Sequence, residues 1–146
     1  MSHIKKNMLS FFLTTKCNLD CSYCYTNKKT HQHQSIPFKF AKLGIDTFLG
    51  VNNIKHIRFF GAGEPTEEFA LLQQICEYAD QTAHFKVTKE IQTNGVISSQ
   101  KACWLAEHFD IIWVSCDGTP KIQNYFRRTI SGKPTSNLLE KNIKYL

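Results

Sequence analysis

The sequence predicts an α/β protein with a parallel sheet whose strands are connected by helices. Strand-like apolar runs alternate four times with segments whose apolar residues recur at helical spacing. A polar or glycine-containing loop follows each strand-like run, and a helix start follows each loop. The chain has 146 residues, of which 42% are hydrophobic and 21% charged, so it can form one globular domain with a substantial core.

The first strand is predicted over residues 8–14, which are mostly apolar. A loop follows it to about residue 26. A helix is then expected from Pro37, because a proline at the first helical position has no N–H to leave unpaired, and Gly50 can end it. The apolar residues expected on the inner face of this helix are Ala41, Ile45, Phe48 and Leu49.

The second strand is predicted over residues 54–60, and the helix after it begins at Pro65. Glu67 and Glu68 favour this start, because carboxylates in the first turn of a helix are stabilised by the helix dipole. The apolar stripe of this helix is expected to contain Phe69, Leu72, Ile75, Cys76 and Ala79.

The third strand is predicted over residues 86–93, and a serine of the pair at 98–99 can cap the helix after it. The fourth strand covers residues 111–116, and the Thr-Pro pair at 119–120 starts another helix. The residues expected to face inward on these two helices are Ala102, Leu105 and Ala106, then Ile122, Tyr125 and Phe126. A last helix is expected to begin near Ser136 and to carry Leu138, Leu139, Ile143 and Leu146.

The unusual residue patterns of the chain all lie in the loops that follow the strands. In a parallel sheet with crossover helices, the carboxyl ends of the strands meet at one edge, and binding sites form there. We therefore expect these four loops to converge on one site. They lie at residues 15–26, 61–65, 93–95 and 115–118.

Three of the six cysteines lie within eight residues, as Cys17, Cys21 and Cys24, with the spacing C-x3-C-x2-C. Clustered thiols favour a metal site, because thiolates are soft ligands for iron and zinc. Three cysteines cannot all pair among themselves, which argues against a disulfide framework. Two kinds of metal site stay open: a zinc site completed by His31 or His33, and an iron–sulfur cluster with one iron that no side chain holds.

The cysteine loop resembles that of the radical S-adenosylmethionine (SAM) enzymes, whose pattern is C-x3-C-x-aromatic-C, with Tyr23 in the aromatic position. Residues 61–65, Gly-Ala-Gly-Glu-Pro, are similar to the GGEP motif of that family. Residues 93–95, Thr-Asn-Gly, resemble the end of the third strand in that family. Residues 115–118, Ser-Cys-Asp-Gly, resemble the S-L-D-G element of its peptide-modifying members, with Cys116 in place of the usual apolar residue. Arg127, five residues before a glycine, matches an arginine of these enzymes.

This resemblance implies the roles of individual residues. Cys17, Cys21 and Cys24 would hold three irons of a 4Fe-4S cluster, and SAM would bind the fourth iron through its amino and carboxylate groups. The residues that the resemblance places around SAM are Tyr23, Ala62, Gly63, Glu64, Thr93, Asn94, Ser115 and Arg127.

Within this set, the Glu64 carboxylate and the neighbouring backbone are expected to accept hydrogen bonds from the SAM amino group. Arg127 is expected at the SAM carboxylate, since an arginine can bind a carboxylate through two hydrogen bonds, and Arg128 is an alternative. The other cysteines are expected to be buried apolar residues: Cys76, Cys103 and Cys116.

The resemblance further implies a partial (β/α) barrel and the reductive cleavage of SAM to a 5′-deoxyadenosyl radical that abstracts hydrogen. The motifs favour the branch that modifies peptides and proteins, which includes the SPASM-type anaerobic sulfatase maturases. The implied partners are a peptide or protein substrate and an electron donor such as flavodoxin or ferredoxin. Two other functions remain possible: an iron–sulfur electron-transfer module without chemistry of its own, and a zinc-stabilised interaction domain.

The motifs extend over nearly the whole chain, so residues 1–146 are predicted to be the N-terminal part of a radical SAM core, apparently truncated and without an auxiliary-cluster domain. A complete barrel needs about 250 residues, so we expect this chain to assemble the cluster but to catalyse poorly. The formal charge is +6, but the basic residues form no long stripe, so we do not expect nucleic acid as a partner. No apolar run is long enough for a membrane span or a secretory signal, and we expect a cytoplasmic protein.

Overall fold

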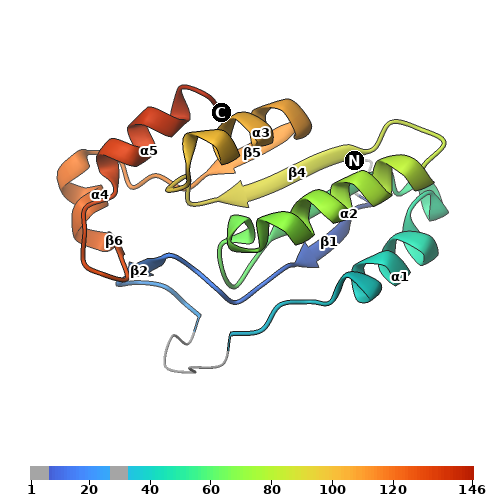
Figure 1. Ribbon diagram of the computed structural model, residues 1–146, viewed down its shortest axis with the longest axis horizontal. Coiled ribbons are helices and arrows are strands. Elements are labelled where there is room, and N and C mark those ends of the chain that lie inside the picture. Colours follow the sequence, from blue (N-terminus) through green and yellow to red (C-terminus); the bar gives the residue numbers. More distant parts are fainter. Residues whose placement is uncertain (1–6, 27–32) are drawn as a thin grey trace, which may run out of the picture.

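The structure is a computed structural model that describes residues 7–26 and 33–146. Its main sheet has four parallel strands, which confirms the predicted α/β class (Figure 1). The chain passes through at least one helix between successive strands of this sheet, as expected for parallel neighbours. In spatial order the strands are β1 (Leu9–Phe12), β3 (His56–Phe60), β4 (Thr88–Thr93) and β5 (Ile111–Val114).

Helices α1 (Phe38–Phe48), α2 (Phe69–Thr82) and α3 (Ser99–His108) cover one face of the main sheet (Figure 1). The sheet and these helices enclose the main hydrophobic core. Its members include Phe11, Ile57, Phe59 and Ile91 from the strands, and Ala41, Ile45, Leu72, Ile75, Ala79, Ala102 and Leu105 from the helices. Within residues 7–26 and 33–146, no helix is long and apolar enough to cross a membrane.

The helices begin where the sequence predicts. Pro37 directly precedes α1, and Pro65 opens a short 3-10 helix that leads into α2. The first residue of the predicted serine pair is the cap of α3, because Ser98 Oγ accepts a hydrogen bond from the Lys101 backbone N–H at 3.2 Å. In the described part of the chain, two 3-10 helices lie between the longer elements: η1 (Val51–Asn53) and η2 (Pro65–Glu68).

A second, smaller sheet lies at the end of the molecule toward which β1 and β4 point (Figure 1). It pairs β2 (Leu19–Cys21) with β6 (Arg127–Thr129) in antiparallel orientation. Helices α4 (Pro120–Phe126) and α5 (Ser136–Ile143) lie at the same end. The sequence predicts neither of these short strands, since their pairing joins segments more than 100 residues apart.

The predicted inner face of α4 is wrong. Ile122, Tyr125 and Phe126 are all exposed, whereas Gln123 has 1% exposure. The reason is that α4 packs against β6 and α5 rather than on the main sheet. The Gln123 side chain accepts a hydrogen bond from the Asp117 backbone N–H at 3.0 Å and thereby joins α4 to the end of β5.

Smaller corrections concern single side chains. Phe48 is half exposed in the last turn of α1, and Ala106 is exposed because Phe109, just beyond α3, completes the inner stripe instead. Cys76 is buried as predicted, but Cys103 is half-buried on the side of its helix. Cys116 is exposed because the chain has left β5 at Val114 and turns toward the surface.

The face of the main sheet opposite the helices carries a nearly buried carboxylate, that of Glu90. Trp113 Nε1 donates a hydrogen bond to Glu90 Oε1 at 2.8 Å. Arg58 Nε and His56 Nε2 lie 3.0 and 2.9 Å from the same carboxylate, within ion-pair distance but outside hydrogen-bond geometry. This face therefore differs from the apolar face beneath the helices.

Asn142 of α5 connects the C-terminal helix to the loop after β4. Its side chain is fully buried, and Nδ2 donates hydrogen bonds to the carbonyl oxygens of Gly95 and Ile97 at 2.9 and 2.6 Å. Both carbonyls belong to the loop that follows the third predicted strand. One amide group thus fixes the loop to α5.

Replacing Asn142 with alanine should destabilise the protein strongly, because two buried carbonyl groups lose their donors. We expect the free energy of unfolding to fall by about 2–4 kcal/mol, measured by chemical denaturation of the apoprotein. Asn137→Ala, on the exposed side of the same helix, is the matched control and should change that free energy by no more than about 0.5 kcal/mol. Equal effects of the two substitutions would contradict the assigned role of Asn142.

Candidate functional site

A pocket of about 190 Å³ lies at the carboxyl ends of β1, β3, β4 and β5, next to the small sheet. The expected convergence of the four loops is found here, since each of them contributes to the lining. All eleven site residues predicted from the sequence line the pocket: Cys17, Cys21, Tyr23, Cys24, Ala62, Gly63, Glu64, Thr93, Asn94, Ser115 and Arg127.

The three clustered cysteines supply the soft ligands of the pocket. Each thiol is free of a disulfide and half-buried. Burial raises the pKa of Cys17 to about 11, so the apoprotein carries this group as a neutral thiol that must lose its proton to bind a metal. The Cys24 backbone N–H donates to the Cys21 carbonyl at 3.1 Å, which forms the turn between the last two ligands.

This donor set suits an iron–sulfur cluster. A 4Fe-4S cluster takes each thiolate on a different iron, so its ligands need not meet at one point. Among the described residues there is no group of three or more His, Cys, Asp or Glu side chains arranged around a single metal ion. His33 is exposed, and His31, the other ligand of the zinc alternative, lies outside the described residues.

Glu64 has the most completely enclosed carboxylate of the site, with 2% exposure. Oε1 accepts hydrogen bonds from Thr66 Oγ1 and Thr93 Oγ1, each at 2.8 Å, and from the Thr66 backbone N–H at 3.2 Å. Oε2 accepts one from the Asn94 backbone N–H at 2.7 Å. Burial raises the pKa of Glu64, although the hydrogen bond from Asn94 and those from the two threonines oppose the rise.

These contacts give Glu64 a structural role in addition to its predicted place in the pocket lining. Its carboxylate joins the loop after β3 to the end of β4. The Thr93 hydroxyl also fixes this region, because it donates a hydrogen bond to Glu64 and accepts one from the Gly95 backbone N–H at 3.1 Å. The backbone at residues 61–63 remains part of the pocket lining.

Asn94 connects β4 to the cysteine loop. Its Nδ2 donates to Asn18 Oδ1 at 2.8 Å and lies 4.0 Å from Cys17 Sγ. The Asn18 side chain in turn donates to the Val96 carbonyl at 2.7 Å. The Asn94 side chain therefore holds the loop in place beside the first cysteine.

Tyr23 and Arg127 meet at Asp117, a residue that follows β5. The Tyr23 hydroxyl donates to the two Asp117 carboxylate oxygens at 2.6 and 2.8 Å, and Arg127 Nε donates to Oδ1 at 2.8 Å. Burial alone would raise the pKa of Asp117, but the hydrogen bonds from Tyr23 and Arg127 outweigh it and lower this pKa. Burial, followed by the hydrogen bond to Asp117, raises the pKa of Tyr23 to about 12.

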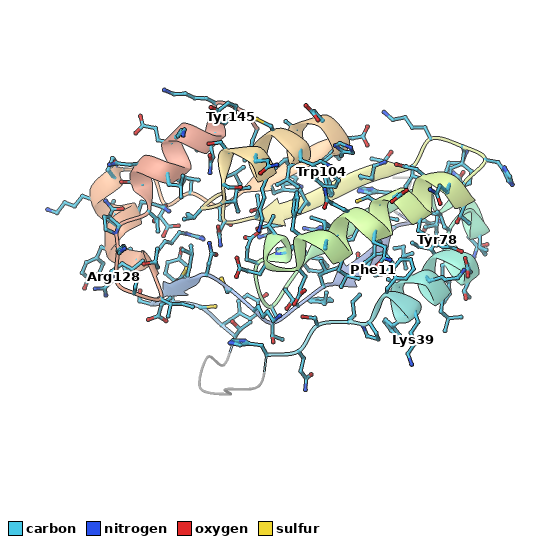
Figure 2. All side chains as sticks on the ribbon, in the orientation of Figure 1. Phe11, Lys39, Tyr78, Trp104, Arg128 and Tyr145 are labelled. Carbon is cyan, nitrogen blue, oxygen red and sulfur yellow. The ribbon has the colours of Figure 1, made fainter. Side chains whose placement is uncertain are left out.

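The alternative arginine lies elsewhere. Arg128 is exposed, because successive side chains of β6 point to opposite faces. Figure 2 shows it at the outer edge of the end that carries the small sheet. Of the two neighbouring arginines, Arg127 lines the pocket.

Sequence reasoning missed several parts of the site. Gln92 could have been found, since it is a polar residue within a predicted strand. Asn18 lies in the cysteine loop and Asp117 in the loop at residues 115–118. Their hydrogen-bond partners Asn94 and Tyr23 are distant in the chain, and no sequence pattern indicates these contacts. The additional lining residues are Leu19, Tyr25, Phe60, Gly61 and Gln92.

The sequence matches the family described as 4Fe-4S single cluster domain over residues 7–141. An uncharacterized protein of Methanocaldococcus jannaschii is 35% identical over 126 residues, covering 85% of this chain and 43% of that protein. The cysteine-type anaerobic sulfatase-maturating enzyme of Clostridium novyi is 28% identical over 146 residues, covering 91% of this chain and 38% of the enzyme.

Solved structures agree with the fold. Native anSMEcpe with bound AdoMet (SAM) is similar with a TM-score of 0.78 at 24% identity, covering 94% of this chain and 40% of that one. The chain thus spans less than half the length of each of these proteins. In sequence it is similar to anaerobic sulfatase-maturating enzymes, as the radical SAM resemblance of its motifs predicts. Because the family match extends over most of the sequence, the chain belongs to the 4Fe-4S single-cluster domain family.

Proposed function

We propose that this chain binds a 4Fe-4S cluster through Cys17, Cys21 and Cys24 and binds SAM in the adjoining pocket. When present and reduced by one electron, these two groups together supply a 5′-deoxyadenosyl radical that can take a hydrogen atom from a substrate. The observation that carries the proposal is the convergence of three cysteine thiols and all the predicted SAM-contacting residues on one pocket. The AdoMet bound in similar structures supports it.

The residues of the pocket divide into two groups by what they do. Arg127 can receive a carboxylate through its guanidinium, and the backbone at residues 61–63 can receive an ammonium. Tyr23 and Ser115 complete this accessible group. The second group fixes the strand ends through hydrogen bonds and consists of Glu64, Thr93 and Asn94.

The substrate that we propose is a peptide or protein. The relatives named as sulfatase-maturating enzymes support this choice, as do structures of anSMEcpe with bound peptides. The electron would come from a small donor such as flavodoxin or ferredoxin, and the site of action would be the cytoplasm. The chain covers less than half of each of these relatives.

The proposal is tested by anaerobic reconstitution with iron and sulfide, reduction with dithionite and assay of 5′-deoxyadenosine from SAM. Changing Cys17, Cys21 and Cys24 together to alanine should abolish both the cluster absorbance and the product, because no ligand would remain for the irons. Cys103→Ala, on α3 and away from the pocket, should retain iron and product within about twofold.

Two results would contradict the proposal in different ways. A colourless protein that binds one zinc would favour the interaction domain. A cluster that forms normally but whose electron paramagnetic resonance signal ignores SAM would favour an electron-transfer module.

Gly63 lies where the loop after β3 passes close to the cysteine loop. A Cβ added there would lie 2.2 Å from the Lys16 carbonyl oxygen and 2.7 Å from that of Thr14. The neighbouring Glu64 backbone N–H donates to the same Lys16 carbonyl at 2.7 Å. Because the atoms in the way belong to the backbone, they cannot move aside without shifting the cysteine loop.

Gly63→Ala should therefore weaken SAM binding to the reconstituted protein by about tenfold or more, measured by equilibrium dialysis. Gly132→Ala is the matched control. Gly132 has a φ of +78° with nothing within 4 Å of an added Cβ, so this change should cost about 1 kcal/mol of stability but leave SAM affinity unchanged. Unaltered SAM affinity in Gly63→Ala would show that the close backbone approach does not shape the site.

A further inference from the structure

We propose that Asp117 is a positioning residue that orients the Arg127 guanidinium toward the SAM carboxylate and ties it to Tyr23 of the cysteine loop. This inference rests on the proposed function, because it assigns Asp117 a role in binding the same cofactor. Asp117 is not among the residues that line the pocket. It would therefore act through Arg127 and Tyr23 rather than by touching SAM.

Three separate segments meet at this carboxylate. Tyr23 comes from the cysteine loop between two of its ligands, Asp117 follows β5, and Arg127 begins β6. The hydrogen bonds measure 2.6 and 2.8 Å from the Tyr23 hydroxyl and 2.8 Å from Arg127 Nε. The Arg127 guanidinium carbon also lies 5.4 Å from the centre of the Tyr23 ring, so ring and carboxylate hold the same cation.

Backbone contacts reinforce the arrangement at the small sheet. Cys21 pairs with Arg127 in the β2–β6 register, and the Ser22 backbone N–H donates to the Phe126 carbonyl at 3.0 Å. The backbone thus brings the arginine next to the cysteine loop. Asp117 then determines how its side chain is turned.

The atom that Asp117 engages matters for the chemistry. A guanidinium has five N–H donors, and a bond from Nε leaves those of the two terminal nitrogens for a second carboxylate. The side chains of Asp117 and Arg127 have only 17% and 16% exposure. A charge-assisted hydrogen bond at such a site holds the planar group more firmly than a solvated ion pair would.

Charge neutralisation and orientation by Asp117 predict opposite effects on SAM binding. If Asp117 served merely to neutralise Arg127, removing its charge would leave a stronger cation and tighten SAM binding. If it orients Arg127, losing the hydrogen-bond acceptor weakens binding, while an isosteric amide that still accepts from Nε preserves it.

The test compares the affinity of SAM and of decarboxylated SAM for the full chain, reconstituted with its cluster, by equilibrium dialysis. Asp117→Ala should weaken SAM binding by about tenfold and change the affinity for decarboxylated SAM by less than about twofold. Asp117→Asn should restore most of the SAM affinity. Asp110→Ala removes an aspartate paired with Lys86 before β5, and it should affect neither ligand.

Iron content and thermal unfolding are measured for each variant. Tyr23→Phe provides a second variant if Asp117→Ala fails to load its cluster, and it should weaken SAM binding by a few-fold with the same ligand selectivity. Equal losses for both ligands, or tighter SAM binding in both Asp117 variants, would overturn the inference and leave the proposed function intact. Failure of the unmodified, iron-loaded chain to bind SAM would overturn both.

Discussion

The site depends on the hydrogen bonds that the buried Glu64 carboxylate accepts. Transfer of an unpaired carboxylate from water into a protein interior is very unfavourable, so Glu64 is tolerated there because hydrogen bonds surround it. Its partners include Thr93 and Asn94, which come from the end of β4, while Glu64 itself follows β3. The carboxylate therefore fixes two adjacent strand ends relative to each other. The Asn94 side chain then donates a hydrogen bond to Asn18, the residue after the first cysteine, and so connects these strand ends to the cysteine loop.

The cysteine loop is held from both sides, although the sides use different chemistry. On the β4 side it contacts the amide of Asn94. On the β5 side it contacts the carboxylate of Asp117 through Tyr23, and its strand β2 pairs with β6. Such support matters because a cofactor site works when its ligands are held close to their productive geometry before the cofactor arrives. The two sets of contacts together place three thiols and an arginine around one pocket.

Much of the fold could be predicted from local signals. Strand-like runs alternate with segments whose apolar residues have helical spacing, and proline or serine marks where helices begin. The residues of the pocket could be predicted because they lie in short motifs at strand ends. What could not be predicted depends on contacts between distant segments. One example is the pairing of β2 with β6, which joins distant segments of the chain. Another is the exposed apolar face of α4, which results from the packing of α4 against β6 and α5. The motif of Glu64 gives no sign that its carboxylate also binds Thr93 and Asn94, because these two partners lie about thirty residues away at the end of β4.

The most direct test of the account is whether SAM binds the iron that the three cysteines leave open. Electron–nuclear double resonance on the reduced, reconstituted chain, with SAM carrying a nitrogen-15 label in its amino group, measures the coupling between that nitrogen and the cluster. We predict a clear hyperfine coupling in the unmodified chain. A reduced cluster that shows no coupling although SAM is bound would contradict the claim, because SAM would then occupy the pocket without touching iron.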